Sequence, residues 1–150
     1  MTQPTRKDEV AADAPVSEDA TLTFIGRIET PWPRREDCPR RGRLDGPECT
    51  LIVDPPWDRA LEGIEGFEGL DILYWLHQSR RDLLIQNPAH ADRVRGTFAL
   101  RSPIRPNPIG LSRVRLVRRA GNRLVVRGLD CVDGTPLLDI KPETCPAAGA

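Results

Sequence analysis

The chain has 150 residues, of which 39% are hydrophobic, and this content suffices for one compact core but not for two. Its 22 basic and 22 acidic side chains cancel, and no run of 18 apolar residues is present that would span a membrane. The polar N-terminus lacks the features of a signal or transit peptide. We therefore expect one folded domain in a soluble, cytoplasmic protein that does not enter a membrane.

The cysteines are widely separated, without a C-x-x-C pair, and only two histidines are present to complete a metal site. Zinc sites in proteins use closely spaced Cys and His ligands, so we expect no bound metal. Nothing in the sequence indicates an oxidising compartment. We expect free thiols at Cys38, Cys49, Cys131 and Cys145.

Residues 1–20 hold five acids and many Ala and Pro residues, with no hydrophobic periodicity. Burial of so few apolar side chains does not offset the entropy of ordering the chain. We predict a disordered acidic tail over 1–20, a folded domain over 21–145 and a short C-terminal tail over 146–150.

The folded part begins with alternating apolar residues over 22–28, which predict a strand that ends at Thr30-Pro31. A loop rich in arginine and proline follows over 32–47. Loops of that length within a compact domain are usually functional or disordered. Trp32 beside five arginines favours a functional loop.

The middle of the chain alternates between apolar and polar segments. A strand is expected over 49–53, and two prolines then introduce a short helix over 57–64. Residues 70–76 form an apolar run that is interrupted only by Asp71, which predicts a strand buried on both faces. Residues 79–95 are charged and contain an Asn-Pro pair, so we expect a loop there.

The last third contains the clearest strand signals. We expect a short strand over 96–100, a hairpin of 111–118 and 124–127 around Ala-Gly-Asn, and strands over 129–132 and 137–140 around an Asp-Gly turn. Six or seven short strands predict a mainly β fold: a small β-barrel with short helices and long loops. No Gly-x-Gly-x-x-Gly element follows a strand, so the sequence gives no support for a Rossmann-type dinucleotide site.

The segment RSPIRPNPIG, residues 101–110, contains three prolines within six residues. Proline fixes φ and removes an amide donor, so this backbone is rigid and extended. It presents the side chains of Arg101, Ser102, Arg105 and Asn107 as a preorganised binding site would. A rigid structural connector is the alternative interpretation.

The segment 130–142 has a tight turn at Asp133-Gly134, followed by Asp139 and Lys141. Two residues apart on a strand, these last two side chains lie on one face. They can form an ion pair or hold a polar ligand. The commoner role of such a pair is a surface ion pair of little energetic value.

Arginine outnumbers lysine 20 to 2 and is concentrated over 34–43 and over 101–127, where eight arginines stand without an acid. The planar guanidinium suits bidentate contacts to phosphate and stacking on bases. The arginines therefore indicate a polyanionic partner. For those over 113–119, a solvated strand face is the alternative.

Together these segments resemble the TsaA-like (TrmO-type, YaeB-like) family, the S-adenosylmethionine-dependent methyltransferases that act on threonylcarbamoyladenosine beside the tRNA anticodon. The resemblance covers residues 24–142 and rests on the number and order of the shared motifs. Chief among them are PR at 39–40, HQ at 77–78, RPNPIG at 105–110, DGTP at 133–136 and DIKP at 139–142.

The resemblance implies a β-barrel methyltransferase outside the Rossmann-like and knotted classes, which works on tRNA as a homodimer. It also implies which residues hold S-adenosylmethionine, and these fall on loops and strand ends, where rigid scaffolds place binding groups. They are Pro39, Arg40, Arg41, His77, Gln78, Arg101, Leu111, Asp133, Gly134, Thr135 and Pro136.

In the implied reaction a carbamoylated adenine nitrogen attacks the methyl group in line, and positioning supplies most of the rate. The nitrogen also loses a proton, for which Asp139, beside Lys141, or His77 is the expected acceptor. A structural histidine is the alternative for His77. The residues expected to bind the substrate are Arg34, Arg35, Arg105 and Asn107.

The chain departs from the family pattern at Arg41, where glutamine is usual, and at Glu143, where tyrosine is usual. Two alternatives to tRNA methylation therefore stay open. One is a methyltransferase of the same fold that acts on a small metabolite. The other is a non-catalytic module that binds S-adenosylmethionine or RNA.

Overall fold

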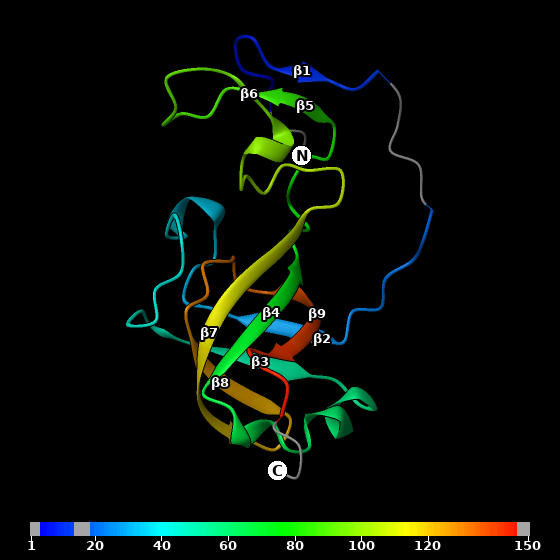
Figure 1. Ribbon diagram of the computed structural model, residues 1–150, viewed down its shortest axis with the longest axis vertical. Coiled ribbons are helices and arrows are strands. Elements are labelled where there is room, and N and C mark those ends of the chain that lie inside the picture. Colours follow the sequence, from blue (N-terminus) through cyan, green and yellow to red (C-terminus); the bar gives the residue numbers. More distant parts are fainter. Residues whose placement is uncertain (1–3, 14–18, 147–150) are drawn as a thin grey trace. The chain divides into compact units, whose positions relative to one another are not determined.

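Six strands of the computed structural model close into a barrel, in the order β2-β3-β8-β7-β4-β9 (Figure 1). The structure describes residues 4–13 and 19–146. The predicted mainly β fold, a small barrel with short helices, is confirmed. The barrel strands are β2 (Gly26–Glu29), β3 (Glu48–Val53), β4 (Gly69–Trp75), β7 (Ile109–Ala120), β8 (Arg123–Arg127) and β9 (Thr135–Pro142).

The chain divides into two compact units. One, the barrel unit, comprises the described residues of 22–75 and 110–150. The other, the small unit, comprises the described residues of 1–21 and 76–109 and contains a three-stranded sheet in the order β1-β5-β6. This division is absent from the sequence-based prediction of one domain over 21–145.

Alternate residues of the barrel strands fill most of the barrel interior, although β3 buries three residues in a row. In β4, Leu70, Ile72 and Tyr74 are buried, whereas the residues between them are only half-buried. A strand in a closed barrel turns one face inward and the other outward, so the prediction of burial on both faces was wrong. The other fully buried apolar residues of the barrel, each at most 1% exposed, are Ile28, Leu51, Val53, Val114, Leu124, Val126 and Leu137. Burial stabilises the fold by about 1.5–3 kcal/mol for each such side chain.

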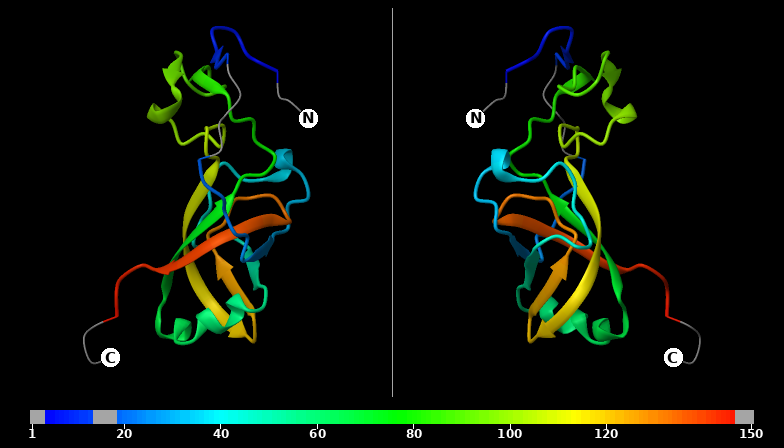
Figure 2. Two further views of the ribbon diagram at one scale, coloured as in Figure 1. Left: turned by 90° about the vertical axis from the view of Figure 1, so that its right-hand side faces the viewer. Right: turned by 90° about the vertical axis from the view of Figure 1, so that its left-hand side faces the viewer.

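The predicted hairpin in the last third is confirmed as β7 and β8, which pair antiparallel from Ala120 opposite Arg123. The register shifts between Leu116 and Arg118, and an irregularity of this kind bends a strand. Figure 2 shows β7 as a long, curved strand. Its curvature allows it to follow the barrel wall.

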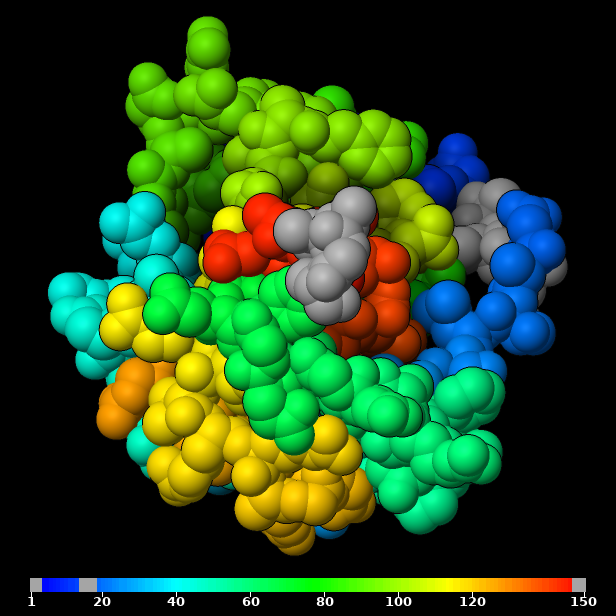
Figure 3. Space-filling view, turned by 60° about the horizontal axis from the view of Figure 1, so that its bottom comes forward, coloured from blue at the N-terminus to red at the C-terminus, as the bar shows by residue number. Residues whose placement is uncertain are grey.

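The helix predicted over 57–64 is instead a pair of 3₁₀ turns, η2 (Trp57–Leu61) and η3 (Ile64–Gly66). Arg119, near the end of β7, donates to the carbonyl of Leu61 at 3.1 Å and to the carboxylate of Glu65 at 3.0 Å. These bonds fix both turns to the hairpin, and Figure 3 shows the two segments side by side, in green and yellow. A further 3₁₀ turn, η1 (Arg35–Asp37), interrupts the arginine-rich loop.

In the small unit, β5 (Leu83–Gln86) lies between β1 (Val10–Ala11) and β6 (Arg95–Gly96). The sequence predicted a loop over 79–95 and missed β5, because its pairing partners lie far from it along the chain. The strand predicted over 96–100 was also wrong. That segment forms the 3₁₀ turn η4 (Thr97–Ala99), in which the buried Thr97 hydroxyl donates to the carbonyl of Leu83 at 2.6 Å.

Part of the N-terminal segment that we expected to be disordered pairs with β5 through β1. The backbone N–H of Asn87 donates to the carboxylate of Glu9 at 2.9 Å, and its side-chain amide donates to the carbonyl of Lys7 at 3.0 Å. The structure thus gives residues 4–13 partners that composition alone did not indicate. Residues 1–3 and 14–18 of the expected tail, and 147–150 at the other end, lie outside the described residues.

Candidate functional site

A buried hydrogen-bonded group lies near the end of β4 in the barrel unit. Tyr74, 3% exposed, donates its hydroxyl hydrogen to Oδ1 of Asp130 at 2.9 Å, and its oxygen lies 2.7 Å from Oγ of Ser112 on β7. A phenol has only one hydrogen, so Ser112 is the donor to Tyr74. The three side chains therefore form a directed chain of hydrogen bonds, which ends at the Asp130 carboxylate.

The protonation of Tyr74 is fixed by its surroundings. Burial, and after it the negative charge of Asp130, raise the pKa of Tyr74 far above its usual value, because both disfavour the phenolate. The hydroxyl therefore remains a donor. The sequence placed Tyr74 in an apolar strand and gave no sign that its hydroxyl has partners.

Gly110, the glycine of the RPNPIG motif, leaves space for the ring of Tyr74. A Cβ atom at Gly110 would overlap the ring of Tyr74. The absence of a side chain at this position is therefore what lets β7 approach Tyr74 so closely. The motif residue and the hydrogen-bonded group belong to one structural feature of the barrel unit.

The segment predicted as a strand over 129–132 is a loop that is held by β2 and the residues after it. The backbone N–H of Asp133 donates to the carbonyl of Trp32, and that of Gly134 to the carbonyl of Ile28, both at 2.8 Å. Within 129–132, the carbonyl of Cys131 accepts a hydrogen bond from the Thr30 hydroxyl at 2.9 Å. The strand prediction was wrong because the segment is held by these separate hydrogen bonds and not by a strand ladder. The apolar pattern that suggested a strand reflects the burial of Leu129, Cys131 and Val132.

Two residues of the DGTP turn hold the turn itself. Oδ1 of Asp133 accepts a hydrogen bond from the backbone N–H of Thr30 at 3.0 Å. The hydroxyl of Thr135, which is buried, donates to the carbonyl of Val132 at 2.6 Å. The turn is thereby fixed at the start of β9, and the contact of these residues with a cofactor stays a prediction.

The loop that carries residues 39–41 packs against the same segment. Gly42 lies so close to Gly128 that a Cβ atom at position 42 would overlap the Gly128 carbonyl. Burial, followed by the charge of Asp130, raises the pKa of the Cys38 thiol, so the carboxylate lies near this loop. The barrel unit therefore brings together loop 39–41 and Asp130.

Asp130, Tyr74 and Ser112 are not among the residues that we predicted to form the site. The available sequence signal was the position of Asp130 at the start of the segment 130–142. The predicted residue Leu111 directly precedes Ser112 and is 51% exposed. A carboxylate held by a buried phenol beside two loops is suited to bind a cation.

In the small unit, the proline-rich segment 101–108 is fixed through its carbonyl groups. Arg81 donates to the carbonyl of Pro106 at 2.6 Å, and Gln86 donates to that of Ile104 at 2.8 Å. Prolines have no N–H, so this segment is held largely through its carbonyl acceptors. The predicted substrate ligand Arg105 donates within the same segment, to the carbonyls of Leu100 at 2.8 Å and Ser102 at 3.0 Å.

The other predicted residues of the small unit lie at its surface. The backbone N–H of Leu76 donates to the carbonyl of Pro108 at 2.8 Å. This bond brings the chain neighbours His77 and Asn107 into the same region of the small unit. Among the predicted site residues of this unit, the exposed ones are His77, Gln78, Arg101 and Asn107, and exposure is what a ligand contact requires.

The predicted placement of Asp139 and Lys141 on one face is confirmed, since Nζ of Lys141 lies 2.9 Å from Oδ2 of Asp139. Oδ1 of Asp139 also accepts the backbone N–H of Ile140 at 2.9 Å. Both side chains are about half exposed, and such a pair contributes little to stability. The strand β9 lies between β2 and β4 rather than at an edge. A role of Asp139 as proton acceptor stays a prediction.

With the exception of Arg115, the arginines on β7 and β8 form ion pairs with acids in the described part of the chain. Arg113 donates to Asp71 at 2.5 Å, and Arg118 and Arg127 share Glu48 at 3.2 and 3.4 Å. Two further pairs, Arg119 with Glu65 and Arg123 with Glu29, complete the set. These ion pairs support the interpretation of this region as a solvated strand face and not as a cationic surface that binds a polyanionic partner.

The arginines of loop 32–47 differ from one another. Arg34 donates two hydrogen bonds to Asp37, at 3.0 and 3.1 Å, and Arg43 pairs with Asp45 in the same way. Arg40 and Arg41 are exposed and form no ion pair within residues 4–13 and 19–146. The side chains of Arg40 and Arg41 are therefore available to an anion.

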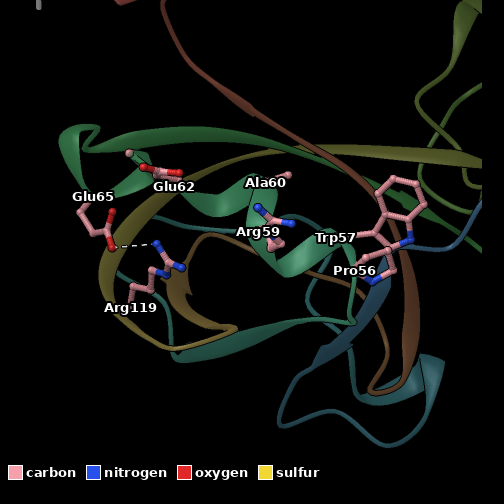
Figure 4. Close-up of a pocket in the computed structure, with 8 residues that line it drawn as sticks. Pro56, Trp57, Arg59, Ala60, Glu62, Glu65 and Arg119 are labelled. Carbon is pink, nitrogen blue, oxygen red and sulfur yellow. Dashed lines mark hydrogen bonds and ion pairs between the residues drawn. The ribbon is translucent and has the colours of Figure 1, made fainter.

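A separate depression lies at the end of the barrel that carries η2 and η3 (Figure 4). Figure 4 shows Trp57 on the side opposite the Glu65–Arg119 ion pair. The wall mixes acids and bases, and none of the predicted site residues lines it. The lining residues are Pro56, Trp57, Arg59, Ala60, Glu62, Gly63, Glu65 and Arg119.

Three further observations concern metal ions, thiols and membrane-spanning helices. Within the part of the chain that the structure describes, no group of three or more His, Cys, Asp and Glu side chains is arranged to hold a metal ion. The cysteines are free, as predicted. None of the helices in this same part is long and apolar enough to cross a membrane.

The sequence model of the tRNA-methyltransferase O N-terminal domain family matches residues 27–145. A Rhizobium radiobacter protein, named probable S-adenosyl-L-methionine-binding protein VirR, is 54% identical over 138 residues, which cover 92% of this chain and 79% of that protein. An S-adenosyl-L-methionine-binding protein of Archaeoglobus fulgidus is 38% identical over 120 residues, or 80% of this chain and 86% of that protein.

A crystal structure of TrmO from Pseudomonas aeruginosa superposes with a TM-score of 0.68 at 34% identity and covers 89% of this chain. The present chain spans 60% of that TrmO chain. The resemblance that the sequence motifs indicated is confirmed by the matched model and by this structural similarity. The chain therefore belongs to the tRNA-methyltransferase O N-terminal domain family.

Proposed function

We propose that this chain binds S-adenosylmethionine and transfers its methyl group to tRNA. The single observation that carries the proposal is the family match over residues 27–145, nearly the whole barrel unit and most of the small unit. The names of two relatives, both S-adenosyl-L-methionine-binding proteins, support the cofactor. The proposed acceptor is the N6 of threonylcarbamoyladenosine beside the anticodon, which is the family activity that the sequence motifs imply.

The residues of the barrel unit fit this cofactor. S-adenosylmethionine has a positively charged sulfur and a carboxylate, which suit a protein carboxylate and arginines, respectively. The unit offers the oriented carboxylate of Asp130 and, on loop 39–41, the exposed side chains of Arg40 and Arg41. When bound, the cofactor supplies an electrophilic methyl group.

The chain's own contribution to the reaction is alignment and removal of one proton. Fixed loops reduce the entropy lost on binding, and the contacts at Gly42 and in the DGTP turn fix two of them. For the proton, Asp139 and His77 are the proposed acceptors. Asp139→Asn and His77→Gln distinguish them, because loss of the true acceptor lowers kcat far more than it weakens cofactor binding.

tRNA is the proposed partner, and the exposed side chains of Arg40 and Arg41 are the proposed phosphate contacts of loop 32–47, together with Arg35. We further propose a homodimer in the cytoplasm. Light scattering of the full chain would test the dimer, and a monomer at micromolar concentration would contradict it.

The test of the activity uses labelled S-adenosylmethionine and two tRNA pools, one from a strain that makes threonylcarbamoyladenosine and one from a strain that does not. Label in the first pool alone supports the proposed acceptor. Label in both pools supports tRNA methylation at another position. No label in either pool contradicts tRNA methylation.

A second candidate is a module that binds the cofactor without methyl transfer. It is favoured by the names of the two relatives, which state binding and not transfer, and by Arg41 in place of glutamine. Cofactor binding with no methylated product from tRNA or from a metabolite extract would support it. A labelled small molecule would instead support a methyltransferase of metabolites.

A further inference from the structure

The hydrogen bonds around Tyr74 have a direction that the positions of its partners fix. The Tyr74 hydroxyl gives its only hydrogen to Asp130, at 2.9 Å, and receives one from Ser112, at 2.7 Å. Both bonds stabilise negative charge on Asp130, the first directly and the second by polarising the phenol. The carboxylate is thus oriented by this chain of hydrogen bonds.

The barrel needs the ring of Tyr74 for packing, but it does not need the hydroxyl. The ring packs in the interior with nine apolar residues of the barrel strands that are at most 1% exposed. A phenylalanine at position 74 would fill the same space without requiring a partner on the neighbouring loop. A buried phenol that must be hydrogen-bonded is thus a costly way to fill space, which points to a use for Asp130.

The position of Asp130 in the chain indicates which parts of the predicted cofactor site it adjoins. The residue lies two positions after Gly128, whose carbonyl contacts Gly42, and three positions before the DGTP turn at Asp133. The carboxylate also acts on the thiol of Cys38, which precedes loop 39–41 directly. In the barrel unit, Asp130 therefore belongs to the segment that connects the contact between Gly128 and Gly42 with the DGTP turn, and both of these adjoin residues that are predicted to hold the cofactor.

We propose that Asp130 binds the positively charged sulfur of S-adenosylmethionine, and that Tyr74 and Ser112 are positioning residues that orient its carboxylate. This inference rests on the proposed function, because it requires that the chain binds the cofactor. A carboxylate lowers the energy of a neighbouring cation, and it does so more strongly where water is partly excluded. It has no such effect on the demethylated product, S-adenosylhomocysteine, whose sulfur is neutral.

The experiment is calorimetric titration of the full chain with S-adenosylmethionine and with S-adenosylhomocysteine. In Asp130→Asn the affinity for S-adenosylmethionine should fall by about 10-fold to 100-fold, as expected for loss of a contact to a charged group. The affinity for S-adenosylhomocysteine should change much less. The ratio of the two affinities is the readout, because a general loosening of the site would weaken both ligands alike.

Tyr74→Phe and Ser112→Ala test the positioning role. Tyr74→Phe keeps the ring that packs beside Gly110 and removes only the hydroxyl. It should lower the affinity ratio in the same direction as Asp130→Asn but by a smaller factor, and Ser112→Ala by a smaller factor still. These variants also keep the test decisive if Asp130→Asn fails to fold.

The matched control is Asp71→Asn, the same chemical change in the same unit. Asp71 lies on β4 as Tyr74 does, but its carboxylate pairs with Arg113 on the outer face of the barrel. Both affinities should stay unchanged in this variant. Circular dichroism confirms that each variant is folded.

The outcomes separate this inference from the function on which it rests. If the wild type binds both ligands and Asp130→Asn weakens them equally or not at all, the role of Asp130 is overturned and the proposed function stands. If the wild type binds neither ligand, both are overturned. A selective loss of S-adenosylmethionine binding in Asp130→Asn, with the smaller loss in Tyr74→Phe, supports the inference.

Discussion

Gly110 and the ring of Tyr74 lie so close together that position 110 has no room for a side chain. Gly110 ends the proline-rich motif and begins the barrel part of β7, while Tyr74 is the hydrogen-bond donor to Asp130. Gly110, a residue of the sequence motif, is thus required to leave space for Tyr74, which lies outside the motif.

Gly110→Ala should lower the free energy of unfolding by about 1–3 kcal/mol, because the new methyl group must displace the ring or the strand. Urea denaturation measures this change. The control is Gly66→Ala, where a Cβ atom would meet no atom within 4 Å and stability should hardly change. Equal stability of the two variants would contradict the close approach of Gly110 to Tyr74.

Stability should decline at alkaline pH because of Tyr74. Its pKa is raised by burial and by Asp130, whereas a tyrosine in the unfolded chain titrates near its usual value of about 10. Below that pH both states hold the proton, and above it only the folded state does. The unfolded state then binds fewer protons, so the free energy of unfolding falls as the pH rises above about 10.

The chain has one tyrosine, so phenolate absorbance reports this group alone. We expect the absorbance to appear together with unfolding, as followed by circular dichroism, and not before it. Tyr74→Phe should make the free energy of unfolding less dependent on pH in this range. Phenolate absorbance with the usual tyrosine midpoint in the folded protein would refute the buried hydrogen-bonded phenol.

The thiols should differ in reactivity. Cys145 is exposed, whereas burial raises the pKa of Cys49 to about 11 and that of Cys131 to about 12. Because the thiolate is the reactive form, a thiol reagent at a pH of about 8 should label Cys145 fast and Cys38 more slowly. The two buried thiols should react only when the protein unfolds.

Mass spectrometry after brief labelling identifies the modified residues. In Cys145→Ser the fast phase should disappear. Fast labelling of Cys49 or Cys131 in the folded protein would show that the barrel opens far more readily than its packing indicates.

Arginines of the barrel unit should contribute unequally to tRNA binding. Arg40→Gln and Arg41→Gln should each weaken binding and lower the slope of log affinity against log salt by about 0.7–0.9 if the side chain contacts a phosphate. Arg118→Gln is the matched control. Because Arg118 already pairs with Glu48, its substitution should leave the slope unchanged. Filter binding over a salt series measures all three. An equal effect of the three substitutions would indicate diffuse electrostatic attraction instead of contacts by the loop.

The sequence predicted those elements whose signal is local. The β7–β8 hairpin follows from alternating apolar residues around a Gly-Asn turn, and the ion pair of Asp139 and Lys141 follows from their spacing on a strand. Pairing between neighbours in the chain costs little loop entropy, so local patterns predict it well.

The predictions that failed concern segments whose partners are distant in sequence. The strand β5 is surrounded by charged residues and is formed by pairing with β1 and β6. The apolar residues of 129–132 suggest a strand, but the segment is a loop. It is held by the Thr30 hydroxyl, which donates to the carbonyl of Cys131, and by the following residues 133 and 134, which pair with residues 28–32. A pattern within one segment does not reveal which of these arrangements buries its apolar side chains.

By itself, the sequence determined the mainly β barrel and the family, because both rest on the order and spacing of residues along the chain. Only the tertiary structure decided which polar groups meet. Tyr74, Ser112 and Asp130 come from three segments, and the barrel joins them because β4 and β7 are neighbours while a loop held by β2 supplies the carboxylate. Hydrogen bonds depend on distances in space, and a linear pattern does not contain these distances.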